Sequence, residues 1–128
     1  MSESKVIKIV YAEDSRAIYN LIISKLHAEG WEVLHFENGD GVADAVLNSK
    51  PDVVILDKEM PVKDGMIVLE ELKANPETKD VPIIFFTTKS DPQTVMRCLQ
   101  LGVTDFVVKD SLAVANLIPR IKGIIGRH

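Results

Sequence analysis

The stretch VVILDKEMPVKDG, residues 53–65, joins four apolar residues directly to an aspartate. An apolar run of this length, followed by turn residues, predicts a strand buried on both faces, as in a parallel sheet. The strand would end on Asp57, with Glu59 and Asp64 close behind in the next loop. A core strand usually stops at a neutral turn residue. What the rest of the chain brings to this strand end therefore decides what Asp57 does.

The rest of the chain repeats the pattern of a short apolar run followed by an amphipathic segment, five times in all. The expected strands cover residues 6–11, 31–36, 53–56, 81–86 and 106–108. Five strand–helix units predict an α/β fold, a five-stranded parallel sheet with helices on both faces. Because a barrel would need eight units, we expect an open, doubly wound (βα)5 sheet.

The first expected helix has an apolar face and a clear end. Ile18, Leu21, Ile22 and Leu26 recur at helical spacing, so we expect them on one buried face. Gly30 is expected to end this helix.

Two later helices differ in how clearly the sequence marks their ends. Asp91 and Pro92 are expected as the N-cap and first residue of a helix that Gly102 ends. The last helix contains Pro119, which would kink a helix interior. It either runs through this proline or begins at Asn116 as its N-cap, and the sequence leaves both alternatives open.

Composition favours one globular domain of ordinary type. With 46% hydrophobic and 27% charged residues, the chain 1–128 is expected to be a single domain with its core at about 6–125. No apolar run approaches the roughly 20 residues of a membrane helix, and MSESK does not resemble the start of a signal peptide. We therefore expect a cytoplasmic protein that does not enter a membrane. A single Cys98 excludes an internal disulfide, and a net charge of −4 without basic clusters argues against nucleic-acid binding.

Ligands of open α/β sheets bind outside the carboxyl ends of the strands. Polar residues follow four of the five expected strands: Glu13 and Asp14 the first, Asp57 and Glu59 the third, Thr87, Thr88 and Lys89 the fourth, and Lys109 the fifth. The acids of the first and third strands would repel one another unless a cation compensates their charge.

A hard divalent cation is the expected compensator for these acids. Mg²⁺ suits a site with few carboxylates that also takes a phosphate oxygen. Lys109 adds a positive charge and Thr87 a hydroxyl donor, which together can stabilise a transferring phosphoryl group. Asp57 is then the nucleophile that takes this group as an acyl phosphate. On this interpretation the strand ends on an acid because a rigid element must hold the nucleophile at the sheet edge.

Several short motifs occur in one order along nearly the whole chain: ED at 13–14, DKEMPVKDG at 57–65, IIFFTT at 83–88, KSDP at 89–92, LGVTDF at 101–106 and VVK at 107–109. Each motif is weak alone, but the complete set at these spacings is specific. The chain resembles the receiver domain of two-component response regulators, including the single-domain type of chemotaxis regulators. This resemblance implies a flavodoxin-like receiver fold.

The resemblance also implies how the acids divide the work. Asp57 resembles the phosphoacceptor of the family. Glu13 and Asp14 resemble the acids that bind Mg²⁺ together with Asp57 and the backbone carbonyl of Glu59. Asp14 has a second role open to it, the N-cap of the first helix.

Three further residues match the family's signalling parts. Thr87 is similar to the switch hydroxyl that moves to the phosphoryl oxygen, and Lys109 to the lysine that contacts the phosphoryl group. Phe106 matches an aromatic whose rotamer follows that movement, and a plain core or edge aromatic is the simpler alternative.

The resemblance implies protein partners and no substrate turnover. The phosphoryl donor would be a sensor histidine kinase or a histidine phosphotransfer protein. A downstream protein would bind the face formed by the fourth helix, fifth strand and fifth helix. The protein would be a monomer or a phosphorylation-linked dimer.

The chain departs from the family pattern around the site. The family usually has Lys-Pro with a cis bond where this chain has Lys109-Asp110, so a trans bond and a strained cis bond are both open. Thr88 replaces a usually small residue and is expected to crowd access for phosphate. Glu59 and Lys89 either pair across the mouth of the site and slow loss of the phosphoryl group or remain two solvated side chains.

Two other classes of function fit the sequence less well. A phosphatase of the haloacid dehalogenase type also uses a strand-terminal aspartate with Mg²⁺, but it requires an aspartate at the position of Glu59 and a cap segment. A flavin or nucleotide binder would need a glycine-rich turn after the first strand, where this chain has AEDSR. Whether the receiver acts alone or is part of a longer regulator is left open by the sequence.

Overall fold

The computed structural model describes residues 6–88, 90–110 and 112–126. Strands and helices alternate five times, as the sequence predicts: β1 Lys8–Ala12, α1 Arg16–Ala28, β2 Glu32–Phe36, α2 Val42–Ser49, β3 Val53–Leu56, α3 Gly65–Ala74, β4 Ile83–Thr87, α4 Pro92–Leu101, β5 Asp105–Val108 and α5 Ala113–Ile125.

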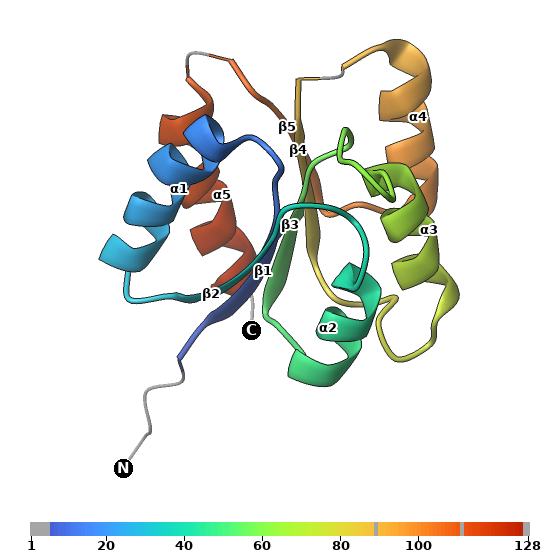
Figure 1. Cartoon of the computed structure of the whole chain (residues 1–128), viewed down its shortest axis with the longest axis horizontal. Helices are drawn as coiled ribbons and strands as arrows, with labels where there is room; N and C mark the ends of the chain where they lie inside the picture. The colour runs from blue at the N-terminus through green and yellow to red at the C-terminus, as the bar shows by residue number, and fades with distance from the viewer. Residues whose placement is uncertain (1–5, 89, 111, 127–128) are drawn as a thin grey trace.

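The five strands form one parallel sheet in the order β2-β1-β3-β4-β5. Helices α1 and α5 cover one face of the sheet, and α2, α3 and α4 cover the other (Figure 1). The chain winds first outward from β1 to β2 and then in the opposite direction through β3, β4 and β5. The strand order therefore reverses beside β1 and β3, which is where open sheets of this kind bind ligands.

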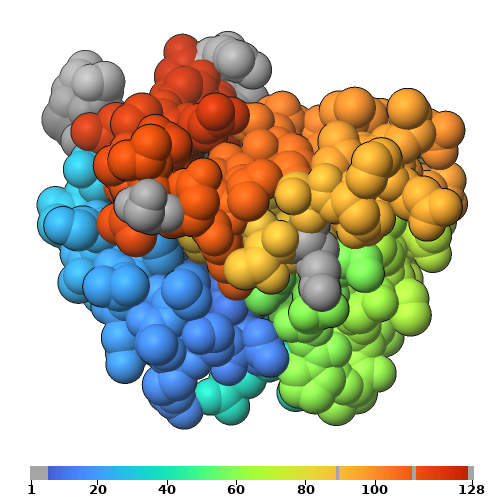
Figure 2. Space-filling model, turned by 90° about the horizontal axis from the view of Figure 1, so that it is seen from above, coloured from blue at the N-terminus to red at the C-terminus, as the bar shows by residue number. Residues whose placement is uncertain are grey.

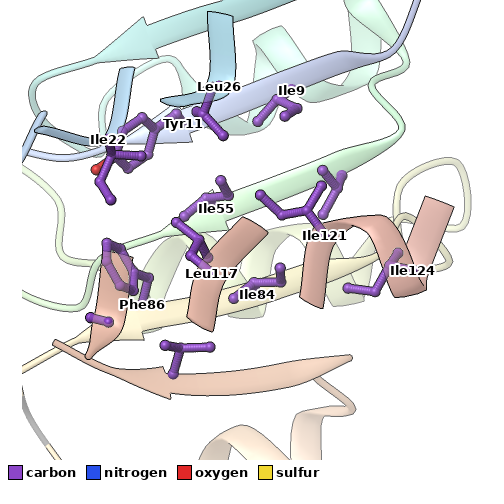
Figure 3. Close-up of a cluster of buried hydrophobic side chains, with 13 residues drawn as sticks. Ile9, Tyr11, Ile22, Leu26, Ile55, Ile84, Phe86, Leu117, Ile121 and Ile124 are labelled. Carbon is purple, nitrogen blue, oxygen red and sulfur yellow. The ribbon is translucent and has the colours of Figure 1, made fainter. Parts of the chain in front are cut away.

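Two apolar clusters, one on each face of the sheet, bury the central strands. All residues of β3 and β4 are buried, and their side chains alternate between the faces. Figure 3 shows the cluster under α1 and α5, which includes Tyr11, Ile55 and Phe86. Because both faces of the central strands are covered, their carboxyl ends are held rigidly.

The first helix shows one error in the sequence prediction. Ile22 and Leu26 are buried as expected, but Leu21 is 55% exposed. Residues four apart lie on one face of a helix, whereas neighbouring residues point about 100° apart, so Leu21 faces solvent beside the buried Ile22.

Helix α4 begins and ends at the residues that the sequence predicts. Asp91 is its N-cap, with the side chain accepting a hydrogen bond from the Thr94 N–H at 3.1 Å, and Pro92 is its first residue. Gly102 ends the helix in the left-handed conformation, with a φ of 83°. This conformation favours glycine because a Cβ is disfavoured there.

Helix α5 runs through Pro119, so the alternative start at Asn116 is wrong. Proline cannot donate the backbone hydrogen bond of a helix interior. Three apolar side chains on the same helix, Leu117, Ile121 and Ile124, are buried against the sheet. Their burial outweighs the missing hydrogen bond. Among the described residues, no helix combines the length and apolar character needed to cross a membrane.

Candidate functional site

The ends of β1 and β3 bring three acids together. One carboxylate oxygen from each of Glu13, Asp14 and Asp57 lies within 4.8 Å of the other two. Glu13 and Asp57 are only 1% and 6% exposed, whereas Asp14 faces solvent. The Asp57 N–H donates to the carbonyl of Ala12 at 3.2 Å, so the pairing of the two strands continues to the acid itself. The acid cluster expected from the sequence is confirmed.

Lys109 connects the acids of both strands. Its Nζ lies 2.8 Å from Asp57 Oδ2 and 2.7 Å from Glu13 Oε1, and its side chain is 7% exposed. The Lys109 N–H donates to the carbonyl of Thr87, which fixes its backbone to the end of β4. The Lys109-Asp110 peptide bond is trans, which answers the question that the sequence left open. One ammonium group therefore holds the ends of β1 and β3 from the end of β5.

The site contains more acid than base. Burial raises the pKa of Glu13 above its ordinary value, the Lys109 ammonium acts against this rise, and the neighbouring Asp57 adds to it. A buried carboxylate without enough positive charge around it is destabilising. Three carboxylates beside one lysine are a set of hard oxygen ligands with uncompensated charge, which fits a divalent cation such as Mg²⁺.

A cleft of about 280 Å³ leads to these acids, and Glu59 and Thr88 lie on its lining. Figure 2 looks onto this edge of the molecule, where the segment after β1 (blue), the loop after β3 (green) and the segment after β4 (yellow) come together. Thr88 is exposed there, in line with its predicted place beside the access route. Lys89 lies outside the described residues, so both alternatives, pairing with Glu59 or a separate solvated side chain, stay open.

The two expected switch residues lie on β4 and β5. Thr87 is fully buried at the end of β4. Phe106 is half-buried in β5, with its ring centroid 5.8 Å from that of Phe85, and it packs against the cluster under α2, α3 and α4. Phe106 does not line the acidic cleft, so its predicted role depends on movement and stays a prediction.

Asp64 and Gly65, the last two residues of the stretch 53–65, have structural roles in the loop after β3. Asp64 is the N-cap of α3, where its side chain accepts from the Ile67 N–H at 3.1 Å. Gly65 passes so close to the strand end that a Cβ there would lie 2.0 Å from the carbonyl oxygen of Asp57. Asp64 is therefore a helix cap, and Gly65 permits the close approach that keeps this loop against Asp57.

Sequence reasoning missed the residues that surround Glu13. The Tyr11 hydroxyl donates to Glu13 Oε1 at 3.2 Å, and the Ser15 N–H donates to Oε2 at 3.2 Å. His35 Nε2 lies 2.9 Å from the backbone carbonyl oxygen of Glu13. Ser15 is also the N-cap of α1, so the alternative of Asp14 as the cap is wrong. The period of two along a strand places Tyr11 and Glu13 on the same side, which was the signal available.

Comparison with known proteins agrees with this geometry. The family model of the response regulator receiver domain matches residues 9–122. The receiver domain of a signal transduction histidine kinase from Syntrophus aciditrophicus is 29% identical, with a TM-score of 0.84 over 95% of this chain and 92% of that one. The receiver domain of a sensor histidine kinase from Pseudomonas aeruginosa is 25% identical, with a TM-score of 0.84 over 95% and 99% of the two chains. That structure has a magnesium ion coordinated in its active site cleft. The Vibrio cholerae chemotaxis protein CheY4, 23% identical with a TM-score of 0.83 over 94% and 99% of the chains, shares the fold.

Proposed function

The chain belongs to the response regulator receiver domain family, and we propose that Asp57 is the residue on which it accepts a phosphoryl group. It is a receiver domain of two-component signal transduction, and the cluster of Glu13, Asp14 and Asp57 fits a phosphorylation site. The surroundings of Asp57 carry this assignment. This acid is fixed at the end of a buried strand, it contacts the Lys109 ammonium, and it faces the two other acids.

The transfer requires one bond to form and one to break. A carboxylate oxygen of Asp57 attacks the phosphorus of a phosphohistidine, and the new O–P bond forms as the P–N bond breaks. The electron pair of the broken bond returns to the imidazole nitrogen of the donor. Later attack of water on the phosphorus releases inorganic phosphate and restores the carboxylate, so the domain resets without turning over a separate substrate.

In this proposal the cation and the lysine together compensate the negative charge of the phosphoryl group. Mg²⁺, held by Glu13, Asp14, Asp57 and the backbone carbonyl of Glu59, would neutralise the phosphoryl oxygens during transfer. The Lys109 ammonium, 2.8 Å from Asp57 Oδ2, is placed to contact the phosphoryl group once that oxygen carries it.

Thr87 and Phe106 complete the proposal as the switch. Thr87 is the last residue of β4, the strand beside β3. Its side chain would turn the hydroxyl toward a phosphoryl oxygen. Phe106, which is half-buried, would follow by changing its rotamer. These movements couple the phosphoryl group to the surface around β5.

The partners follow from the family and from the exposed surface. The donor is proposed to be a sensor histidine kinase or a histidine phosphotransfer protein in the cytoplasm. The proposed output surface is the face of α4, β5 and α5, where Met96, Leu99 and Leu112 are 56%, 60% and 62% exposed. Such a surface suits a downstream protein or a phosphorylation-linked second copy of the chain.

The test is to incubate the protein with Mg²⁺ and acetyl phosphate and to measure the intact mass, beside an Asp57→Asn variant. We expect the wild-type protein to gain the mass of one phosphoryl group when Mg²⁺ is present, and the Asp57→Asn variant to gain none. Amide NMR with beryllofluoride should then shift Thr87, Phe106 and Lys109. Labelling that survives in Asp57→Asn would reject the assignment, and steady turnover of p-nitrophenyl phosphate would indicate a phosphatase instead.

A further inference from the structure

We propose that Tyr11 is a positioning residue, which holds the Glu13 carboxylate of the cation site through its hydroxyl group. The proposal rests on the proposed role of Glu13 as a cation ligand. Tyr11 lies in β1, two residues before Glu13, and is fully buried. Its hydroxyl donates to Glu13 Oε1 at 3.2 Å.

Glu13 needs such support because its side chain is long and lies inside the protein. A glutamate has one more rotatable bond than an aspartate, so a defined position costs more conformational entropy. The Ser15 N–H donates to Oε2 at 3.2 Å, and Lys109 Nζ contacts Oε1 and Oε2 at 2.7 and 2.8 Å. The Tyr11 hydroxyl is the donor among these that comes from the hydrophobic core, on a side chain with little freedom to move.

The Tyr11 ring is itself held on several sides. Figure 3 shows it at the same end of the apolar cluster as Ile22 and Phe86, with its oxygen directed away from Ile9. The ring centroid lies 6.0 Å from that of Tyr19.

His35 joins the same aromatic group from the neighbouring strand. It pairs with Tyr11 in the register of β1 and β2, and its ring stacks on that of Tyr19 at 3.8 Å. Its Nε2 lies 2.9 Å from the backbone carbonyl oxygen of Glu13. The aromatic group of Tyr11, Tyr19 and His35 therefore contacts Glu13 at both its carboxylate and its main chain.

The hydroxyl is available as a donor throughout the neutral range. A tyrosine hydroxyl has an ordinary pKa of about 10, so it carries its proton in this range. Partners that orient a metal ligand commonly change metal affinity by 10–100-fold when they are removed. Loss of this hydroxyl should thus weaken cation binding while the aromatic ring keeps the core filled.

The test compares Tyr11→Phe with Tyr19→Phe in the full chain. Both variants lose one hydroxyl from the same aromatic group, but the Tyr11 hydroxyl donates to Glu13, whereas Tyr19 contacts the group through its ring. Mg²⁺ is titrated calorimetrically into cation-free protein. We expect Tyr11→Phe to raise the Kd about 10-fold or more, and Tyr19→Phe to leave it unchanged.

Acetyl phosphate labelling at a series of Mg²⁺ concentrations supplies a second readout. Tyr11→Phe should raise the Mg²⁺ concentration for half-maximal labelling, and saturating Mg²⁺ should recover the maximal rate. In a Glu13→Asp background, where the shorter side chain is withdrawn from the hydroxyl, Tyr11→Phe should make little further difference to Mg²⁺ affinity.

The outcomes separate the positioning role from the cation site. If wild type binds Mg²⁺ and Tyr11→Phe binds it equally well, the positioning role is overturned, even when the variant has a lower thermal midpoint. An equal loss of affinity in Tyr19→Phe also overturns it, because the effect would then belong to the aromatic packing. If wild type itself does not bind Mg²⁺, the proposed cation site fails, and the positioning role fails with it.

Discussion

Clefts with acidic lining occur at both edges of the sheet, and they differ in how their acids are held. At the amino-terminal edge, a cleft of about 440 Å³ is lined by Glu77 and Asp80 among others, and both are exposed. At the carboxyl-terminal edge, Glu13 and Asp57 line a cleft of about 280 Å³, and both are buried and share the Lys109 ammonium. Exposed acids are solvated by water, whereas buried acids depend on specific partners. Burial of the acids is thus the feature that distinguishes the edge proposed to accept the phosphoryl group from the opposite edge.

The sharpest test of this contrast removes one acid from each edge. Asp57→Asn should abolish Mg²⁺-dependent labelling by acetyl phosphate, because the amide is a poor nucleophile. Asp80→Asn, at the opposite edge, should label at the wild-type rate. Intact-mass spectrometry measures both, and reduced labelling in Asp80→Asn would contradict the division between the edges.

The next largest effect should come from the buried lysine. Lys109→Met leaves Glu13 and Asp57 buried without their ammonium, so the free energy of unfolding should fall by about 3–5 kcal/mol without cation. Mg²⁺ should restore part of this loss. Urea unfolding with and without Mg²⁺ provides the measurement.

A lysine at the opposite edge serves as the control for this prediction. Lys122 pairs with Glu29 at 3.1 Å, with side chains 56% and 32% exposed. Lys122→Met should therefore change the free energy of unfolding by less than about 1 kcal/mol. Similar losses in both lysine variants would show that burial is not what distinguishes the pairs.

Two glycines extend the comparison to the backbone. In Gly65→Ala the new Cβ would meet the Asp57 carbonyl oxygen at 2.0 Å, so the loop must move. We expect a loss of about 1–3 kcal/mol in unfolding free energy together with slower labelling. Gly30 has a φ of 81° and open space around it at the other edge. Gly30→Ala should cost about 1–2 kcal/mol from backbone strain alone and leave labelling unchanged. Normal labelling in folded Gly65→Ala would separate the loop from the site.

The smallest effect is expected for Asp91, an exposed acid that caps a helix. Hydrogen bonds from the Thr94 N–H and hydroxyl lower the pKa of Asp91, the N-cap of α4. A lowered pKa in the folded state contributes stability that is complete above the unfolded pKa and is lost as the pH falls through the folded pKa. Asp91→Asn keeps a capping side chain but cannot titrate. In this variant the free energy of unfolding should therefore fall less steeply as the pH is lowered through the acidic range.

Urea unfolding across the acidic range gives the required comparison. An unchanged slope in Asp91→Asn would mean that the cap contributes nothing to the pH dependence.

Much of this molecule follows from local patterns in the sequence. The apolar run before Asp57 makes a strand that is buried on both faces, and Asp91-Pro92 with Gly102 bounds a helix by capping chemistry that acts over a few residues. These signals work because strand burial and helix capping depend on near neighbours in the chain. The meeting of acids from two strands follows equally, since parallel strands end at a common edge.

Other features were predicted wrongly from the sequence or could not be predicted from it. Leu21 has the apolar character of a core residue but faces solvent, and Pro119 lies inside a helix that its own propensity opposes. In both cases the outcome depends on which side of the helix packs on the sheet. Helix propensity is a weak preference that burial of neighbouring side chains outweighs.

The sequence by itself determined the order of elements, the parallel sheet and the edge at which Glu13, Asp14 and Asp57 gather. Only the tertiary structure decided that Lys109 is shared between Glu13 and Asp57, and that Tyr11 supports Glu13 from the core. The physical reason is distance along the chain. Local patterns fix where each strand ends, but contacts between side chains from different strands depend on how both faces of the sheet pack, and no short stretch of sequence contains that information.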